Sequence, residues 1–121
     1  RDVSTLSGGE RQTVFLAGAL AQAAPILLLD EPTAALDPRH GIEFCQILER
    51  LRRHENLTIV LVTHDLVLAG RFGQRLLLLD QGRVAAEGSP EEVLRPEVLE
   101  GVYGVSWRQI DARTLLPDEP R

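Results

Sequence analysis

The stretch “ILLLDEPTAALD”, residues 26–37, decides the fold because it joins an apolar run to two acids and a helix start. The apolar run predicts a strand buried on both faces, as in a parallel sheet covered by helices. Asp30 and Glu31 stand at its carboxyl end, the edge at which α/β proteins place ligands. Asp37 precedes a proline, an arrangement typical of the cap and first residue of a helix.

The elements on either side of this stretch alternate between helix and strand. Residues 8–22 predict a helix with apolar residues at helical spacing, and a second helix begins at Asp37. The run “LTIVLVTHD”, residues 57–65, predicts a second buried strand, and a short helix over residues 66–72 follows it. This alternation predicts a right-handed parallel sheet covered by helices.

The last part of the chain predicts a hairpin and a capped helix. “RLLLLDQGRVAAEG”, residues 75–88, predicts a hairpin that turns at residues 80–82. “SPEE”, residues 89–92, predicts a capping box with its serine as the cap. The proline and glycines at positions 96, 101 and 104 predict interruptions in the segment after this helix, and “LLPDEPR” predicts a frayed tail.

Charge and composition argue against several classes of protein. The 121 residues carry a net charge of -5, which argues against nucleic-acid binding because a phosphate backbone requires a basic face. The apolar runs are too short to span a bilayer, so we expect membrane contact only through a partner. Cys45 is the single cysteine, which favours a reducing compartment. All 13 Lys and Arg positions are arginine, so no G-x-x-x-x-G-K-[ST] loop occurs within these residues.

“LSGGERQ”, residues 6–12, predicts either an ordinary flexible loop or a phosphate site at the start of a helix. Helix N-termini expose unpaired N–H groups and the positive end of the helix dipole, so they attract phosphate. Glycines at positions 8 and 9 let a phosphate approach the backbone, and Ser7 adds a hydroxyl donor. Taken alone, the flexible loop is the simpler interpretation.

The polar residues at the strand ends also have two interpretations. Asp30 could hold Mg²⁺ through water and Glu31 could orient and activate a hydrolytic water, or both could cap a turn. His64 could be a catalytic group or a local hydrogen-bonding residue. Asp65 and Asp37 could simply be helix caps.

Taken together and in order, “LSGGERQ”, “ILLLDEPTAALD” and “LVTHD” resemble the signature motif, the Walker B strand with its D-loop, and the H-loop of ABC-type ATPases. The resemblance implies an α/β fold: a partial P-loop NTPase of the RecA-like ABC ATPase core. Its parallel strands are covered by helices, a hairpin follows toward the C-terminus, and the N-terminal Walker A half is missing. It also implies one domain in three segments: residues 1–24 with the signature helix, 25–88 with the catalytic core, and 89–121 with a helical tail.

The resemblance implies a role for each site residue. Glu31 would be the catalytic base, His64 would contact the γ-phosphate of ATP, and Asp30 would help to position Mg²⁺. Asp37 would communicate across a dimer of ATPase subunits. The residues expected to bind the ATP held by the opposite subunit are Ser7, Gly8 and Gly9, with Glu10 in the same motif.

The tail “EGSPEEVLRPEVLEGVYGV”, residues 87–105, resembles that of importer ATPases for iron-siderophore, haem and cobalamin uptake. This implies an ATP-binding subunit that couples ATP hydrolysis to import of a metal chelate, with ATP and Mg²⁺ as cofactors. The implied partners are a second, identical ATPase subunit and transmembrane permease subunits, at the cytoplasmic face of the inner (plasma) membrane. Two alternatives stay open: a DNA-repair or chromosome-maintenance ATPase of the ABC type, and a non-enzymatic truncated remnant.

The resemblance also predicts what these residues lack. In the family, the Walker A loop and an adenine-stacking aromatic precede the signature motif, so we expect the 121 residues alone not to hydrolyse ATP. The family's sheet places a further strand between those at residues 58–63 and 75–80. We therefore expect either a gap there or direct pairing of the two strands. Exposed apolar sheet edges predict marginal stability and aggregation of the isolated chain.

Overall fold

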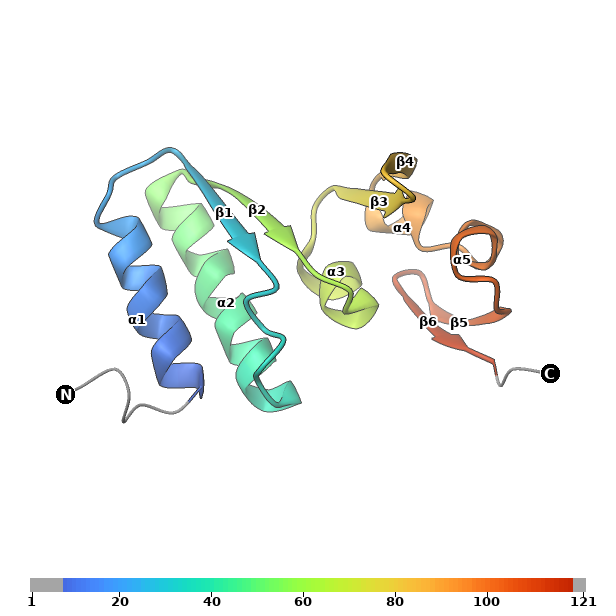
Figure 1. Cartoon of the computed structure of the whole chain (residues 1–121), viewed down its shortest axis with the longest axis horizontal. Coiled ribbons are helices and arrows are strands. Elements are labelled where there is room, and N and C mark those ends of the chain that lie inside the picture. Colours follow the sequence, from blue (N-terminus) through green and yellow to red (C-terminus); the bar gives the residue numbers. More distant parts are fainter. Residues whose placement is uncertain (1–7, 119–121) are drawn as a thin grey trace. The chain divides into compact units, whose positions relative to one another are not determined.

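The computed structural model describes residues 8–118, and the chain divides into two compact units (Figure 1). Unit 1 ends at His64 and unit 2 begins at Asp65. Each unit has its own cluster of buried hydrophobic side chains.

Unit 1 contains two helices and a pair of parallel strands: α1 (Gly8–Leu20), β1 (Ile26–Asp30), α2 (Pro38–Glu55) and β2 (Thr58–Val62). The strands pair in register along their whole length, with Asp30 opposite Val62 at the carboxyl end. Both helices run antiparallel to the strands (Figure 1). The order β1-α2-β2 is a parallel β-α-β unit, as the sequence predicts.

The core of unit 1 joins both helices to one face of the strand pair. Leu16 of α1, Leu27 of β1, and Phe44 and Leu48 of α2 form one buried cluster. The apolar positions of α2 recur at helical spacing and so face this cluster. The core thereby fixes the strand ends that carry the acidic residues.

The prediction that β1 and β2 are buried on both faces is wrong. Leu28 of β1 is 73% exposed, and Ile26, Val60 and Val62 are about half exposed, at 54%, 47% and 52%. Successive side chains of a strand point to opposite faces, and within the described residues of unit 1 the two helices cover one face only. The other face therefore presents aliphatic side chains that no described element of unit 1 covers.

Unit 2 contains three short helices and two hairpins. Its elements are α3 (Leu66–Phe72), β3 (Leu76–Asp80), β4 (Arg83–Gly88), α4 (Pro90–Val93), α5 (Pro96–Tyr103), β5 (Trp107–Asp111) and β6 (Thr114–Pro117). The pairs β3–β4 and β5–β6 are antiparallel and form separate two-stranded sheets. Strand β2 belongs to the sheet of unit 1 and β3 to a sheet of unit 2, so the described residues do not show the direct pairing of these strands, and the expected gap stays a prediction.

Two local predictions for unit 2 are confirmed. The β3–β4 hairpin turns at Gln81 and Gly82, whose φ angles of 50° and 76° are those of a tight turn with two left-handed residues. At the start of α4, the hydroxyl of Ser89 accepts a hydrogen bond from the backbone N–H of Glu92 at 3.3 Å. Pro90 occupies the first turn of the helix, as the capping box predicts.

Two other predictions for unit 2 are confirmed only in part. The chain is interrupted between α4 and α5, just before Pro96, and Gly104 ends α5 in the left-handed conformation, but Gly101 lies within α5 and interrupts nothing. The expected frayed tail contains β6, which pairs with β5. The β5–β6 pair packs on the core of unit 2 through Trp107 and Leu115.

Gly70 marks a close approach of two segments in unit 2. A Cβ atom added to this α3 residue would lie 2.2 Å from the backbone oxygen of Arg113, which is in the β5–β6 turn. The Arg113 side chain also donates to the carbonyl of Gly70 at 3.5 Å and to Glu91 of α4 at 2.5 Å. Hydrogen bonds therefore connect the hairpin to both α3 and α4.

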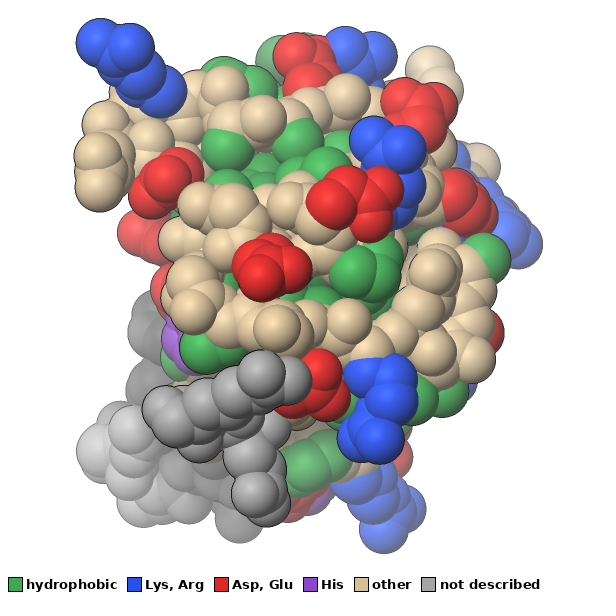
Figure 2. All heavy atoms as spheres, turned by 90° about the vertical axis from the view of Figure 1, so that its right-hand side faces the viewer, with side chains coloured by type: hydrophobic (Ala, Val, Ile, Leu, Met, Phe, Trp, Pro, Cys, Tyr) green, Lys and Arg blue, Asp and Glu red, His purple; other side chains and the backbone are tan. Residues whose placement is uncertain are grey.

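On the face drawn in Figure 2, acidic and arginine side chains are interspersed and no extended basic patch is visible.

Candidate functional site at the carboxyl ends of two parallel strands

The acidic pair and His64 meet where β1 and β2 end. Because the strands are parallel and in register, their carboxyl ends lie side by side. The backbone N–H of Glu31 donates to the carbonyl of Val62 at 2.8 Å, which continues the pairing one residue beyond β1. This hydrogen bond brings Glu31 next to the segment that carries His64.

The carboxylate of Glu31 contacts the imidazole of His64. Glu31 Oε1 and His64 Nδ1 are 2.9 Å apart, across 33 positions of sequence. A carboxylate only accepts, so the shared proton lies on Nδ1. The Glu31 side chain is 35% exposed and that of His64 is 81% exposed, so the pair faces solvent. The backbone of Glu31 has φ 49°, in the left-handed region.

Asp30 ends β1 and is exposed beside this pair. Within residues 8–118, no group of three or more His, Cys, Asp or Glu side chains could hold a metal ion. Mg²⁺ keeps several waters and is commonly bound by one or two carboxylates plus substrate phosphates. A single exposed carboxylate such as Asp30 fits that mode and does not fit an all-protein metal cage.

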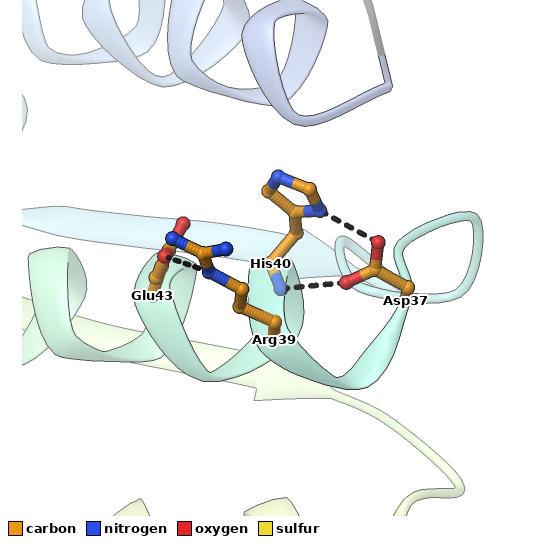
Figure 3. A network of polar contacts seen from close by, with 4 residues as sticks. All are labelled: Asp37, Arg39, His40 and Glu43. Atoms are coloured by element: carbon orange, nitrogen blue, oxygen red, sulfur yellow. Dashed lines mark hydrogen bonds and ion pairs between the residues drawn. The ribbon is translucent and has the colours of Figure 1, made fainter.

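Asp37 is the N-cap of α2 and is held by two hydrogen bonds from His40 (Figure 3). Its Oδ1 accepts from the backbone N–H of His40 at 2.9 Å, and its Oδ2 lies 2.8 Å from the ring Nδ1. The bond from the backbone N–H, and then the bond from the ring, lower the pKa of the Asp37 carboxyl below its ordinary value of 3.8. His40 was not a sequence candidate, although its position three residues after a helix cap is a readable signal.

The glycines of the “LSGGERQ” stretch lie in the first turn of α1. The helix begins at Gly8, and Glu10 is exposed in the same turn. It ends at Leu20, two residues before the predicted end. Ser7 lies outside the described residues. The start of a helix is a general site for phosphate, because its first N–H groups have no partner within the helix.

The loop between the acidic pair and α2 is tightly folded. Leu36 N–H donates to the carbonyl of Thr33 at 3.1 Å, and Ala34 N–H donates to that of Glu31 at 3.3 Å. Thr33 is 8% exposed and thus a buried polar residue. These hydrogen bonds therefore fix the distance between Glu31 and Asp37.

No helix in the described part of the chain is long and apolar enough to cross a bilayer.

Comparison with known proteins identifies this arrangement. The family model described as “AAA domain, putative AbiEii toxin, Type IV TA system” matches residues 1–70, more than half of the chain. The cobalamin import ATP-binding protein BtuD of Halobacterium salinarum is 45% identical over 99% of this chain and 28% of its own length. The iron(3+)-hydroxamate import ATP-binding protein FhuC of Bacillus subtilis is 46% identical over 97% of this chain and 44% of its own length. Other relatives, 41–50% identical, are named for ferric enterobactin, hemin and petrobactin.

Solved structures agree with these relatives. The one described as “An inward-facing conformation of a putative metal-chelate type ABC transporter” matches with a TM-score of 0.87 and 28% identity, over 98% of this chain and 50% of that one. The ATP-binding cassette MJ0796, dimeric and bound to ADP and Pi, matches with a TM-score of 0.62 and 44% identity, over 71% of this chain and 37% of that one.

The chain belongs to this AAA-domain family, and its curated relatives are ATP-binding proteins of ABC importers. The match to the relatives covers both units, whereas the family model ends at residue 70. The predicted fold class is confirmed, since the chain is α/β and its structural neighbours are ABC ATPase domains. The chain spans less than half of the length of these curated relatives.

Proposed function

We propose that these residues belong to the ATP-binding subunit of an importer that couples ATP hydrolysis to uptake of a metal chelate. The observation that carries the proposal is the contact between Glu31 and His64 at the carboxyl ends of adjacent parallel strands, with Asp30 beside it. The names of the relatives supply the substrate class: cobalamin, haem or a ferric siderophore.

Glu31 serves as the catalytic base in this proposal. One of its carboxylate oxygens is held by the Nδ1–H of His64, so the other oxygen is oriented to accept a proton from an attacking water. The left-handed backbone at Glu31 turns the chain immediately after β1 and aims the side chain at His64. Bound Mg²⁺-ATP supplies the phosphoryl group that this water attacks. His64 thereby orients the base, and in this proposal it also contacts the γ-phosphate.

The other site residues bind and align the nucleotide. Asp30 would hold Mg²⁺ through water, the mode that a single exposed carboxylate fits. The first turn of α1, with Gly8 and Gly9, offers backbone N–H groups to the ATP held by a second subunit, together with Ser7 and Glu10 of the same motif. Asp37 communicates across the dimer.

The proposed partners are a second copy of the subunit and transmembrane permease subunits. The dimeric cassette among the structural neighbours supports the first, and the import function of the relatives supports the second. We place the protein at the cytoplasmic face of the inner (plasma) membrane, with membrane contact through the permease. We also propose that the chain forms part of one ATPase domain, in three segments: residues 1–24, 25–88 and 89–121.

The 121 residues alone do not hydrolyse ATP in this proposal. They contain no lysine, and a Walker A loop uses a lysine to reach the β- and γ-phosphates. Phosphate release by the purified chain, measured with contaminating ATPases excluded, is expected to stay at the level of the buffer. Robust turnover would contradict this part of the proposal.

The test of the function uses the whole subunit that carries these residues, assembled with its permease. Glu31→Gln keeps the shape and polarity of the side chain but removes the base, so we expect ATP turnover to fall by about 100-fold or more. The control is Glu55→Gln at the exposed C-terminal end of α2, which leaves turnover unchanged. Uptake of labelled cobalamin, haem and ferric siderophores assigns the chelate. Full turnover by the Glu31→Gln variant would contradict the role of Glu31.

A further inference from the structure

The two carboxylate oxygens of Asp37 have different partners on the same residue. Oδ1 accepts the backbone N–H of His40 at 2.9 Å, the usual contact of a helix N-cap. Oδ2 lies 2.8 Å from Nδ1 of the His40 ring. The cap contact alone would leave Oδ2 to solvent, so the ring is an additional constraint.

The second contact restricts the aspartate side chain. With one oxygen bound, a carboxylate can still turn about its terminal torsion, which is broad. With both oxygens bound to one residue of the first helical turn, that torsion is fixed relative to α2. The ring–carboxylate bond is charge-assisted, and such bonds are shorter and stronger than neutral ones.

The nearest cationic side chain does not compete for Asp37. Arg39 donates its Nε–H to Glu43 at 3.1 Å, one turn further along α2 (Figure 3). The ring of His40 stands between this pair and Asp37 in the same view. Because the carboxylate only accepts, Nδ1 carries the proton, whatever the charge of the ring.

We propose that His40 is a positioning residue, which fixes the Asp37 carboxylate through Nδ1–H so that the loop before α2 can make its contact across the ATPase dimer. This inference rests on the proposed function, because it assigns a purpose to the same loop. His40 acts through Asp37, the residue that its backbone N–H and its ring contact.

The first experiment measures the proton position on the chain itself. In ¹⁵N-histidine NMR at about pH 8.5, where an ordinary imidazole is neutral, we expect His40 to show a protonated Nδ1 and an unprotonated Nε2. The His40→Asn variant assigns the signal by its loss. A protonated Nε2 with a bare Nδ1 would overturn the inference, since that tautomer cannot donate to Asp37.

The second experiment measures ATP turnover by the whole assembled subunit. His40→Ala loses the donor, so we expect kcat to fall by about tenfold with the KM for ATP unchanged, because misplacement away from the chemistry mainly affects the rate. His40→Asn places an amide N–H close to the position of Nδ1 and is expected to restore most of the rate. His54→Ala, which removes a histidine from the last turn of α2, is the matched control and retains the wild-type rate.

The outcomes separate this inference from the proposed function. A wild-type assembly that turns over ATP with an equally fast His40→Ala variant overturns the positioning role alone. Equal losses in His40→Ala and His40→Asn also overturn it, since the amide donor would then not matter. A wild-type assembly without any ATP turnover contradicts the proposed function, and the positioning role with it.

Discussion

Glu31 combines a left-handed backbone with a functional side chain. A non-glycine residue at φ 49° costs about 1 to 2 kcal/mol relative to right-handed conformations, and such residues concentrate at functional sites. The strain is held by the backbone bond to Val62 and by the side-chain bond to His64. The left-handed backbone and the side-chain contact with His64 thus occur together at Glu31.

Replacing Glu31 by glycine and by alanine tests this strain. We expect Glu31→Gly to be more stable than Glu31→Ala by about 1 kcal/mol, because only alanine pays for the left-handed conformation. The free energy of unfolding from urea titration measures the difference. At Glu43, in the middle of an exposed helix face, the same pair should have the opposite order by about 1 kcal/mol. If the alanine variant were more stable than the glycine variant at position 31 as well as at position 43, the backbone of Glu31 would not be strained in solution.

Helix caps were the elements best predicted from the sequence. The side chains of three cap residues each accept a hydrogen bond from a backbone N–H within the next three residues: Asp37, Asp65 and Ser89. Such caps can therefore be predicted from a short stretch of sequence. The Glu31–His64 contact was not predicted, because it depends on the register of two strands, which the sequence does not specify.

The missed elements depended on packing and not on local sequence. Gly101 lies on an exposed position of α5, where glycine costs only about 1 kcal/mol, so it did not end the helix. Strands β5 and β6 form because Trp107 and Leu115 pack on the core of unit 2, which no local pattern reveals. Likewise, the apolar residues of β1 could not show that the helices of unit 1 cover only one of its faces.

The end of α2 gives a prediction at the scale of the helix. Asn56 ends this helix with φ 51°, a position at which glycine is favoured. We expect Asn56→Gly to raise the free energy of unfolding by about 0.5 kcal/mol and Asn56→Ala to lower it by about 1 kcal/mol. Urea denaturation followed by circular dichroism measures both. A less stable glycine variant would contradict the left-handed cap.

The hairpin β5–β6 gives a prediction about pH. Hydrogen bonds from Arg113 lower the pKa of Glu91 below 4.5, through its side chain, and that of Asp111 below 3.8, through its backbone N–H. Carboxyls whose pKa is lower in the folded state stabilise it above the unfolded pKa, and this stability is lost as pH falls through the folded pKa. We therefore expect the urea midpoint to fall between about pH 5 and about pH 3.

Variants of the hairpin contacts locate this effect. Glu91→Gln and Arg113→Gln should flatten the pH dependence to a similar degree, because each removes the side-chain bond that lowers the pKa of Glu91, while the backbone N–H that lowers the pKa of Asp111 stays in both. Glu100→Gln, which removes an exposed carboxylate on α5, is the control and keeps the wild-type slope. A slope unchanged in Glu91→Gln would mean that the ion pair with Arg113 does not form in solution.

At the scale of the whole molecule, both units expose aliphatic strand faces. Leu28, Val60 and Val62 do so in unit 1, and Leu77 and Leu79 in unit 2, with Leu79 64% exposed. Adjoining aliphatic side chains of this kind mark interaction surfaces or sites of aggregation. Each sheet within residues 8–118 has only two strands, so every strand also has an open edge.

We expect the isolated chain to self-associate with rising concentration, and the β1–β2 face to be one cause. Leu28→Thr with Val62→Thr should reduce the association seen by sedimentation velocity while changing the free energy of unfolding by only about 0.5 kcal/mol. Leu27→Thr, the buried neighbour on the same strand, is the control and should cost about 2 to 4 kcal/mol. Unchanged association in the double variant would exclude this face.

The missing side chain at Gly70 has a consequence for how the chain can evolve. The carbonyl of Arg113 occupies the space that any Cβ at position 70 would need, so two positions more than forty residues apart are under one steric constraint. A duplication, swap or redesign of the last hairpin is compatible with this scaffold only where glycine is kept at position 70. Conversely, Gly70→Ala adds a single carbon atom between α3 and the β5–β6 turn. This substitution would separate the hairpin from α3 without any other change in the sequence.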